Sequence, residues 1–431
     1  MKEEKDYLSN TSWLILERVT RLSLVLVVGV FLARYLGPEK YGVLSYCISF
    51  VGMFSAIASL GLDGIVVEKL VNARNNYKNL LGTVLVLKFL GALSVFLITI
   101  FASFIFNNST FESFLIIIIA TALIFDSICV IDLYFQANVQ GQYIAKAKIT
   151  QIAISTLLKF LMIYSNAELY MFALLILVDS FILAVCYLYV FQFQAKKQLS
   201  FDFSVVLAKK LLFASKALIF ADVIISIHTR IDLVMLKYML GLREVGIYRA
   251  ATTLNEAWYF LPMVISASIF PLLVSAKKKD ESEYLDNLQK LFNLMVWMAL
   301  AITIPVILFA DEICFFLYGA EYLGASDVMR IQIMSCVFVF LGVASGKQFL
   351  IEKTYSFVFQ RVLLGVSVNI LLNLYLIPKY NINGAAFSTV ISHFVSSFLF
   401  DVMQPKTRVL FFMKIKSLLF IDKRMFSRKL R

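Results

Sequence analysis

The chain has few charged residues. Asp, Glu, Lys and Arg together make up 16% of its 431 residues, whereas hydrophobic residues make up 61%. Soluble domains carry about 25% charged and about 45 to 50% apolar residues. The composition therefore excludes an ordinary soluble domain and indicates a protein that crosses a membrane several times.

Sequence signatures of catalysis are also missing. The chain has no glycine-rich phosphate loop, no cluster of His, Cys and Asp with metal-ligand spacing, and no long hydrophilic segment that could form a nucleotide-binding domain. We therefore expect that the protein is not an enzyme and binds no cofactor and no metal. Any transport would be driven by an H⁺ or Na⁺ gradient, by the membrane potential or by the substrate gradient. The five cysteines lie in apolar stretches without redox spacing and are interpreted as packing residues: Cys47, Cys129, Cys186, Cys314 and Cys336.

Long apolar stretches are what the chain has instead. A helix needs about 20 apolar residues to cross a hydrocarbon core of about 30 Å, and continuous stretches favour helices over the alternating strands of a membrane barrel. The opening sequence is too acidic for a cleavable signal peptide, so the first helix should remain. We predict an all-α polytopic protein with about twelve transmembrane helices, at 12–33, 42–62, 80–106, 111–134, 144–164, 169–191, 211–236, 246–275, 291–318, 327–350, 355–377 and 382–403.

The distribution of Lys and Arg between these helices predicts the orientation. If the N-terminus is inside, the inside segments carry 28 of the 40 basic residues and the outside segments carry 5. Cytoplasmic loops carry such an excess of basic residues, so both termini should be cytoplasmic. The net charge of +12 then belongs to the cytoplasmic face and does not indicate a nucleic-acid partner.

The remaining seven basic residues lie inside predicted helices. A cation at the centre of a spanning helix costs about 2.5 to 3.5 kcal/mol on insertion scales, so each needs a partner or a wet cavity. A cavity lined with such residues would bind an anion; alternatively they form structural ion pairs or reach the membrane surface. The seven are Arg18, Arg21, Lys88, Lys159, Arg230, Arg249 and Arg330.

Two short segments indicate an internal duplication. The sequence around Leu36 and Gly37 recurs around Leu240 and Gly241, six predicted helices later and on the same side of the membrane. Duplicated halves that enclose a site near the midplane are common in secondary transporters. The tail would lie on anionic lipids as an amphipathic helix or would only enforce topology. We predict an N-terminal six-helix bundle (1–191), a basic cytoplasmic linker (192–210), a C-terminal six-helix bundle (211–403) and a basic amphipathic cytoplasmic tail (404–431).

Charged residues inside the helices supply the candidate site. Glu17, Arg18 and Arg21 share one face of the first helix, and Glu17 and Arg21 are spaced to form an ion pair. Arg249 and Glu256 share one face of the eighth helix. The candidate substrate-binding cations are Arg18, Arg21, Arg230 and Arg249, and the candidate partner or coupling acids are Glu17, Asp126, Asp132, Asp222, Asp232 and Glu256.

Several short motifs are distributed along the chain, at 10–18, 33–46, 59–63, 246–251, 260–262, 269–271, 369–373 and 377–386. They resemble motifs of polysaccharide repeat-unit flippases, the O-antigen (Wzx-like) family of the multidrug, oligosaccharidyl-lipid and polysaccharide exporter superfamily. The N-terminal block is the most specific of them, and the resemblance extends over nearly the whole chain.

This resemblance implies two six-helix bundles around a central cavity that opens alternately to either side, as in multidrug extrusion transporters and the lipid II flippase. It also implies the substrate, an oligosaccharide repeat unit on undecaprenyl pyrophosphate, moved from the inner to the outer leaflet of a bacterial cytoplasmic membrane. A polysaccharide polymerase and a chain-length regulator would be partners. The residues that match the family's cationic lumen positions are Arg18 and Arg21 on the first helix and Arg249 on the eighth.

Three alternatives stay open at this point. A multidrug exporter of the same fold would favour organic cations and an acidic, aromatic cavity. A flippase for capsule or teichoic-acid precursors would differ only in its sugar. A membrane polymerase or ligase acting on lipid-linked sugar should carry a large external loop, whereas every predicted outside loop is short.

Overall fold

The computed structural model describes residues 2–72, 77–106, 109–196 and 202–419, with the side chains of 2–11 and 355 left out. These residues form helices and contain no strand. Ten helices within these ranges are long and apolar enough to cross a membrane. The predicted all-α polytopic fold is confirmed, whereas the cytoplasmic position of both termini stays a prediction.

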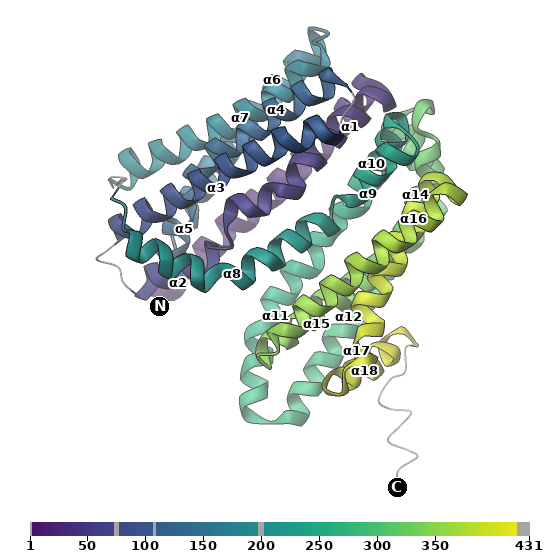
Figure 1. Cartoon of the computed structure of the whole chain (residues 1–431). Helices are drawn as coiled ribbons and strands as arrows, with labels where there is room; N and C mark the ends of the chain where they lie inside the picture. Colours follow the sequence, from purple (N-terminus) through teal and green to yellow (C-terminus); the bar gives the residue numbers. More distant parts are fainter. Residues whose placement is uncertain (1, 73–76, 107–108, 197–201, 420–431) are drawn as a thin grey trace. The chain divides into compact units, whose positions relative to one another are not determined.

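The chain divides by its internal contacts into two units, residues 1–234 and 235–431, and each is described by itself. Figure 1 labels the main helices. Unit 1 contains α1 (Lys2–Ser59), α2 (Asp63–Asn72), α3 (Tyr77–Phe106), α4 (Thr110–Asp126), the 3₁₀ turn η2 (Ser127–Cys129), α5 (Val130–Ala137), α6 (Gly141–Tyr164), α7 (Leu169–Tyr189), the π-helix η3 (Val190–Gln194), α8 (Val205–His228) and the first part of α9 (Ile231–Met239).

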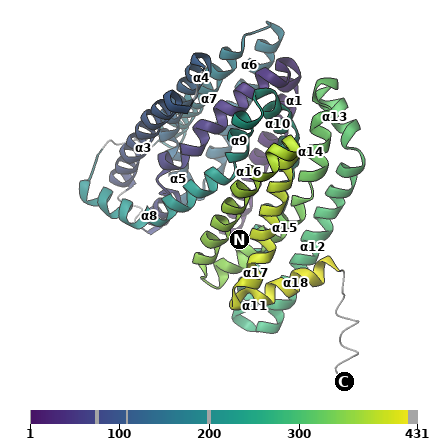
Figure 2. The ribbon, with the colours of Figure 1, turned by 45° about the vertical axis from the view of Figure 1, so that its right-hand side comes forward.

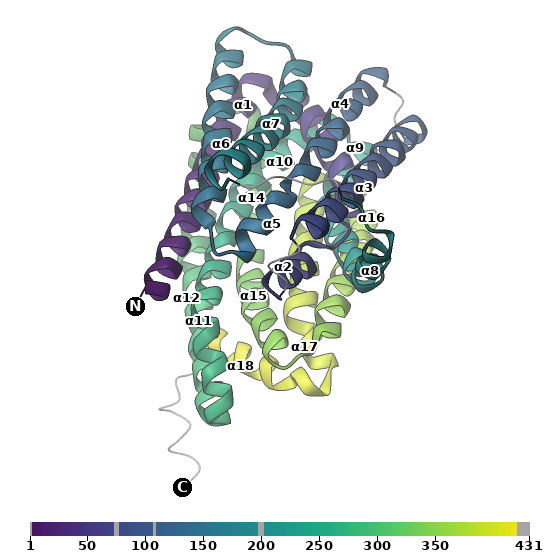
Figure 3. The same cartoon turned by 90° about the vertical axis from the view of Figure 1, so that its left-hand side faces the viewer.

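The long helices of unit 1 pack both against helices adjacent in sequence and against more distant ones. Helix α1 contacts α3, α4, α6 and α8, and α7 packs against both α4 and α6. Figure 3 shows α3, α4, α6 and α7 in a second view. Buried side chains such as Val66, Val84, Ile131 and Phe135 form the core at the α2 and α5 end. By its packing, α8 therefore belongs to unit 1. The sequence grouped 211–236 with the second half, and the predicted domain limits stay a prediction.

Unit 2 is built around α11, α12, α15 and α16, which pack as successive neighbours (Figure 2). Helix α18 lies against α12 and against α17 at the end of the last span. The helices of unit 2 are α10 (Leu242–Glu256), η4 (Ala257–Tyr259), α11 (Phe260–Lys279), α12 (Glu281–Leu308), α13 (Ala310–Tyr318), η5 (Ala320–Tyr322), α14 (Gly324–Gln332), α15 (Ser335–Ile351), α16 (Tyr355–Phe394), the π-helix η6 (Val395–Leu399), α17 (Phe400–Met403), η7 (Pro405–Thr407) and α18 (Arg408–Leu418).

Two kinks reconcile ten long helices with twelve predicted spans. Helix α1 consists of two helices joined at Gly37, and α16 consists of two helices joined at Asn381, each with a positive φ at the joint. Each of the continuous segments Ser12–Asn72 and Ser356–Met403 therefore corresponds to two predicted spans, and each of the other eight overlaps one. The described residues thus hold ten long segments where the sequence predicted about twelve spans, because two pairs of predicted spans are continuous in the chain.

The proposed duplication has a local structural counterpart. Gly37 has φ 70° and ψ 169°, and Gly241, which begins α10, has φ 111° and ψ 176°. Glycine adopts a positive φ without the steric cost that other residues pay. The matched glycines thus make the same kind of turn at equivalent places in the two halves of the sequence.

Several predicted helix ends were wrong. The span predicted at 291–318 is α12, which starts ten residues earlier at Glu281, followed by the separate helix α13. The Asp280 side chain caps α12 by accepting from the Glu283 amide, which sets its true start. Likewise the span predicted at 211–236 ends at His228 in α8, and α9 follows. Helices extend beyond the apolar stretch because capping and backbone hydrogen bonds, not hydropathy, determine where they end.

Large apolar side chains are exposed along the spans of both units. Phe101 and Phe104 on α3 are 69% and 72% exposed, and Leu371 on α16 is 67% exposed. Soluble proteins rarely expose large continuous apolar patches, whereas a spanning helix presents such side chains to lipid. The exposed surface is therefore consistent with a position in the bilayer.

Candidate functional site

The charged face of α1 contains a buried acid and two exposed arginines. The Arg21 Nε lies 2.9 Å from the Glu17 Oε1, so the predicted pair is confirmed. The Glu17 side chain is 6% exposed, whereas the Arg21 side chain is 46% exposed, and Arg18 is exposed as well. Arg21 is thus anchored through Nε by a buried carboxylate while its side chain stays partly exposed, and a guanidinium has further donors that suit an anion.

The Asp132 carboxylate on α5 accepts hydrogen bonds from three side chains. Its carboxylate accepts from Lys148 Nζ at 2.8 Å, from the Tyr187 hydroxyl at 3.0 Å and from Gln136 Nε2 at 3.0 Å. These donors come from α5, α6 and α7, and a buried carboxylate needs such partners. The arrangement indicates that Asp132 links α5 to α6 and α7 through its hydrogen bonds. Its coupling role stays a prediction.

A second charged group lies where α2, α3, α4 and α8 approach each other. Lys88 on α3 is buried, and its ammonium donates to Asp63 Oδ1 at 2.5 Å. Asp126 lies near Ser180 and in the electrostatic range of Lys88. Asp222 on α8 lies in the electrostatic range of Asp63. Two predicted acids, Asp126 and Asp222, are thus brought near one buried cation and a third acid that the sequence reading did not select.

Arg230 lies between α8 and α9, and its guanidinium covers the backbone of α1 at Gly52. A Cβ atom built on Gly52 would come within 1.7 Å of Arg230 Nη1. The absence of a side chain at Gly52 therefore makes room for the guanidinium. Asp232, two residues later, lies in the electrostatic range of His228.

We expect Gly52→Ala to displace Arg230 while leaving the fold intact, because the clashing atoms are the end of a flexible side chain. If the transport expected from the sequence uses Arg230, Gly52→Ala and Arg230→Ala should reduce it to a similar extent, and the apparent unfolding free energy of Gly52→Ala should stay within about 1 kcal/mol of the wild type. The measurement is transport in membrane vesicles alongside thermal unfolding in detergent. Gly29→Ala on the same helix is the matched control, since no atom lies within 4 Å of its added Cβ; normal transport by both variants would contradict the assignment of Arg230.

In unit 2 the candidate cation is also paired. Arg249 Nη1 lies 3.3 Å from Glu256 Oε2, and the two side chains are 34% and 43% exposed. Behind them Asn255 is buried and donates to Met329 O and Gln332 Oε1, each at 3.4 Å. The pair is therefore at the accessible surface of unit 2, above a buried polar contact between α10 and α14.

The sequence found the charged residues but not all of their partners. Glu17 with Arg21 and Arg249 with Glu256 are joined within their helices, as the spacing indicated. Asp63, Lys148 and Tyr187 were missed, because Asp63 and Lys148 fall at predicted span ends and a tyrosine in an apolar stretch counts as packing. No group of three or more His, Cys, Asp or Glu suited to a metal occurs in the ranges that the structure describes.

Comparison with known sequences gives a family and several relatives. A family model described as polysaccharide biosynthesis protein matches residues 7–277. Agl15 of Haloferax volcanii, a probable low-salt glycan biosynthesis flippase, is 22% identical over 40% of this chain and 39% of its own length. The capsular polysaccharide biosynthesis protein CapF of Staphylococcus aureus is 20% identical over 83% of this chain and 89% of its own. The chain spans about a third to two fifths of the length of the archaeal relatives it matches.

Solved structures share the fold at low sequence identity. An inward-facing multidrug transporter of the MATE family matches with a TM-score of 0.72 and 14% identity, over 93% of this chain and 95% of its own. The lipid II flippase MurJ in an inward closed conformation matches with a TM-score of 0.70 and 16% identity, over 94% and 90%. The predicted likeness in fold to multidrug exporters and the lipid II flippase is confirmed.

Proposed function

We propose that this chain, which belongs to the polysaccharide biosynthesis protein family, moves lipid-linked oligosaccharides from one leaflet of a membrane to the other. The family membership confirms the resemblance inferred from the sequence motifs and identifies a multi-pass membrane protein of a flippase family, not an enzyme. The observation that carries the proposal is Arg21, whose guanidinium is paired with the buried Glu17 while its side chain as a whole is still 46% exposed. Such a group suits a phosphate or carboxylate, because arginine presents a fixed fork of donors.

The mechanism we propose starts from these two ion pairs. Arg18 and Arg21 in unit 1 and Arg249 in unit 2 would each serve as binding cations for the anionic headgroup, with Arg21 and Arg249 using donors that their pairs with Glu17 and Glu256 leave over. Keeping these pairs avoids an unpaired charge in the membrane before and after the headgroup binds, which would be costly. The lipid tails would stay in the bilayer while the polar headgroup crosses, and Arg230, positioned against Gly52, would add a further cation.

The specific substrate that we propose is an O-antigen repeat unit on undecaprenyl pyrophosphate in a bacterial inner membrane. A polysaccharide polymerase and a chain-length regulator would then act on the product. Coupling to an H⁺ or Na⁺ gradient would use Asp126 and Asp222, which share the neighbourhood of Lys88, together with Asp232. A capsular precursor is the second candidate, because the relative CapF aligns with 83% of this chain.

Deletion of the gene in its host tests the proposal. We expect surface polysaccharide to be lost and single lipid-linked oligosaccharide units to accumulate, with the chemical analysis of these units distinguishing O-antigen from capsule. Complementation with the wild type should restore both, whereas the combined Arg18→Ala, Arg21→Ala and Arg249→Ala variant should not. Intact polysaccharide with new sensitivity to cationic drugs would overturn the proposal in favour of a multidrug exporter.

A further inference from the structure

Helix α18 follows the last spanning segment within a few residues, so it lies at a membrane surface. The spanning segment Ser356–Met403 ends directly before η7, and α18 begins at Arg408. Residues 420–431 of the predicted tail lie outside the described residues. What α18 presents to its surroundings depends on which side of it is buried against unit 2.

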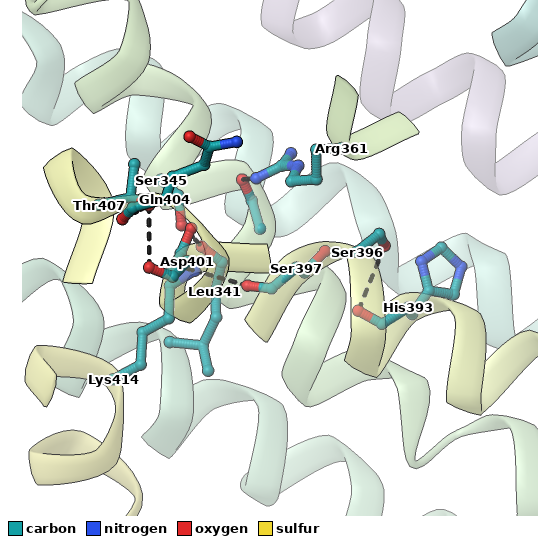
Figure 4. A network of polar contacts seen from close by, with 11 residues as sticks. Leu341, Ser345, Arg361, His393, Ser396, Ser397, Asp401, Gln404, Thr407 and Lys414 are labelled. Carbon is teal, nitrogen blue, oxygen red and sulfur yellow. Dashed lines mark hydrogen bonds and ion pairs between the residues drawn. The ribbon is translucent and has the colours of Figure 1, made fainter. Parts of the chain in front are cut away.

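The buried side of α18 carries the apolar Leu410 and Met413 and, beside them, the cation Lys414. Lys414 and Asp401 are both 0% exposed, and the Lys414 ammonium donates to Asp401 Oδ2 and to the Ser397 carbonyl, each at 2.6 Å. Figure 4 shows these side chains meeting at the junction of the last span and α18. On α12, Gln289 donates to Met413 O at 3.0 Å and to Ser417 Oγ at 2.7 Å. Lys414, one of the basic residues of the predicted amphipathic tail (404–431), is therefore turned inward.

The outward side of α18 is apolar and basic. Val409, Phe412 and Leu419 are 53%, 61% and 63% exposed. Arg408 and Lys416 are exposed in the same stripe, since 408, 412, 416 and 419 recur at helical spacing. The sequence has no Asp or Glu between 402 and 421.

Two features of α18 oppose what water alone would favour: Phe412 is exposed and Lys414 is buried, although apolar burial is favourable and a buried cation is costly. Leu410 and Met413 are buried on the same side as Lys414. An outward face with large apolar side chains is favourable where the outer surroundings are acyl chains and anionic headgroups. Apolar side chains then enter the interface while neighbouring cations contact the lipid phosphates.

We propose that the outward face of α18 is a binding site for an anionic bilayer surface, and that the buried contact between Lys414 and Asp401 fixes the helix in the orientation that forms it. The site goes beyond the flippase activity, since it uses no residue of the α1 or α10 clusters. It also differs from a general attraction of the basic tail, because it depends on the direction in which α18 faces.

The test is the thermal unfolding of the full chain in detergent with added phosphatidylglycerol or, for comparison, phosphatidylcholine. We expect phosphatidylglycerol to raise the Tm of the wild type and the rise to fall by at least half in Arg408→Gln/Lys416→Gln and in Phe412→Ser. Lys278→Gln/Lys279→Gln in α11 is the control, since it removes two exposed cations of the same unit, next to acidic residues, and should keep the full rise.

Lys414→Ala separates orientation from charge. Its response to phosphatidylglycerol should also fall, although Lys414 does not reach the surface. If this variant does not fold, the Arg408→Gln/Lys416→Gln variant alone decides. The proposal would be overturned if phosphatidylglycerol raised the Tm of the Arg408→Gln/Lys416→Gln variant as much as that of the wild type. It would also be overturned if phosphatidylglycerol did not raise the Tm of the wild type while the outward face of α18 bound an acidic peptide.

Discussion

Lys414→Met should lower the apparent free energy of unfolding by about 3 to 5 kcal/mol, the usual effect of removing one partner of a buried ion pair. The variant leaves Asp401 fully buried without its cation. It also removes the donor to the Ser397 carbonyl, which lies in the π-helix η6. Burial lowers the pKa of the Lys414 ammonium to about 8 because desolvation disfavours the charged form, and Asp401 opposes this change. Thermal and denaturant unfolding of purified protein in detergent measure the effect.

Two variants determine whether the pair itself is responsible. Lys416→Met, two residues along the same helix and exposed, should change the free energy by no more than about 0.5 kcal/mol. Combining Lys414→Met with Asp401→Leu should recover much of the loss, because apolar residues often replace a buried ion pair at little cost. A double variant as unstable as Lys414→Met would show that the ion pair is not the source of the loss.

Arg21→Ala should reduce transport of the lipid-linked oligosaccharide about 10- to 100-fold, which corresponds to a charge-assisted hydrogen bond of about 1.5 to 3 kcal/mol. The variant removes the guanidinium that we propose binds the anionic headgroup. Arg21→Lys keeps the charge but loses the two-pronged geometry, so it should be intermediate. Transport is measured as the appearance of labelled oligosaccharide in the outer leaflet of proteoliposomes, normalised to folded protein.

Lys159→Ala is the matched control for this experiment. Lys159 is also a cation of a spanning helix, paired with Asp179 at 3.2 Å, but its side chain is only 22% exposed. If both pairs are structural, the two variants should lose stability and transport together. A loss of transport at unchanged stability in Arg21→Ala alone assigns Arg21 to the substrate, whereas equal losses would show that it is a structural cation.

The sequence alone determined the fold class and located the apolar stretches that form the long helices. Hydropathy is sufficient for this because every spanning segment must satisfy its backbone internally and be apolar over about 20 residues. Spacing along one helix was likewise enough to pair Glu17 with Arg21, since residues four apart are always neighbours in a helix.

Only the tertiary structure decided contacts between different helices. Asp63 with Lys88, Tyr187 with Asp132 and Arg230 over Gly52 join residues that are 25, 55 and 178 positions apart, and no local pattern encodes such distances. The inward turn of Lys414 was missed for a related reason: amphipathicity shows that a helix has two faces, but not which of them is packed against protein and which faces lipid. That choice depends on Asp401 and Gln289, which lie on other helices.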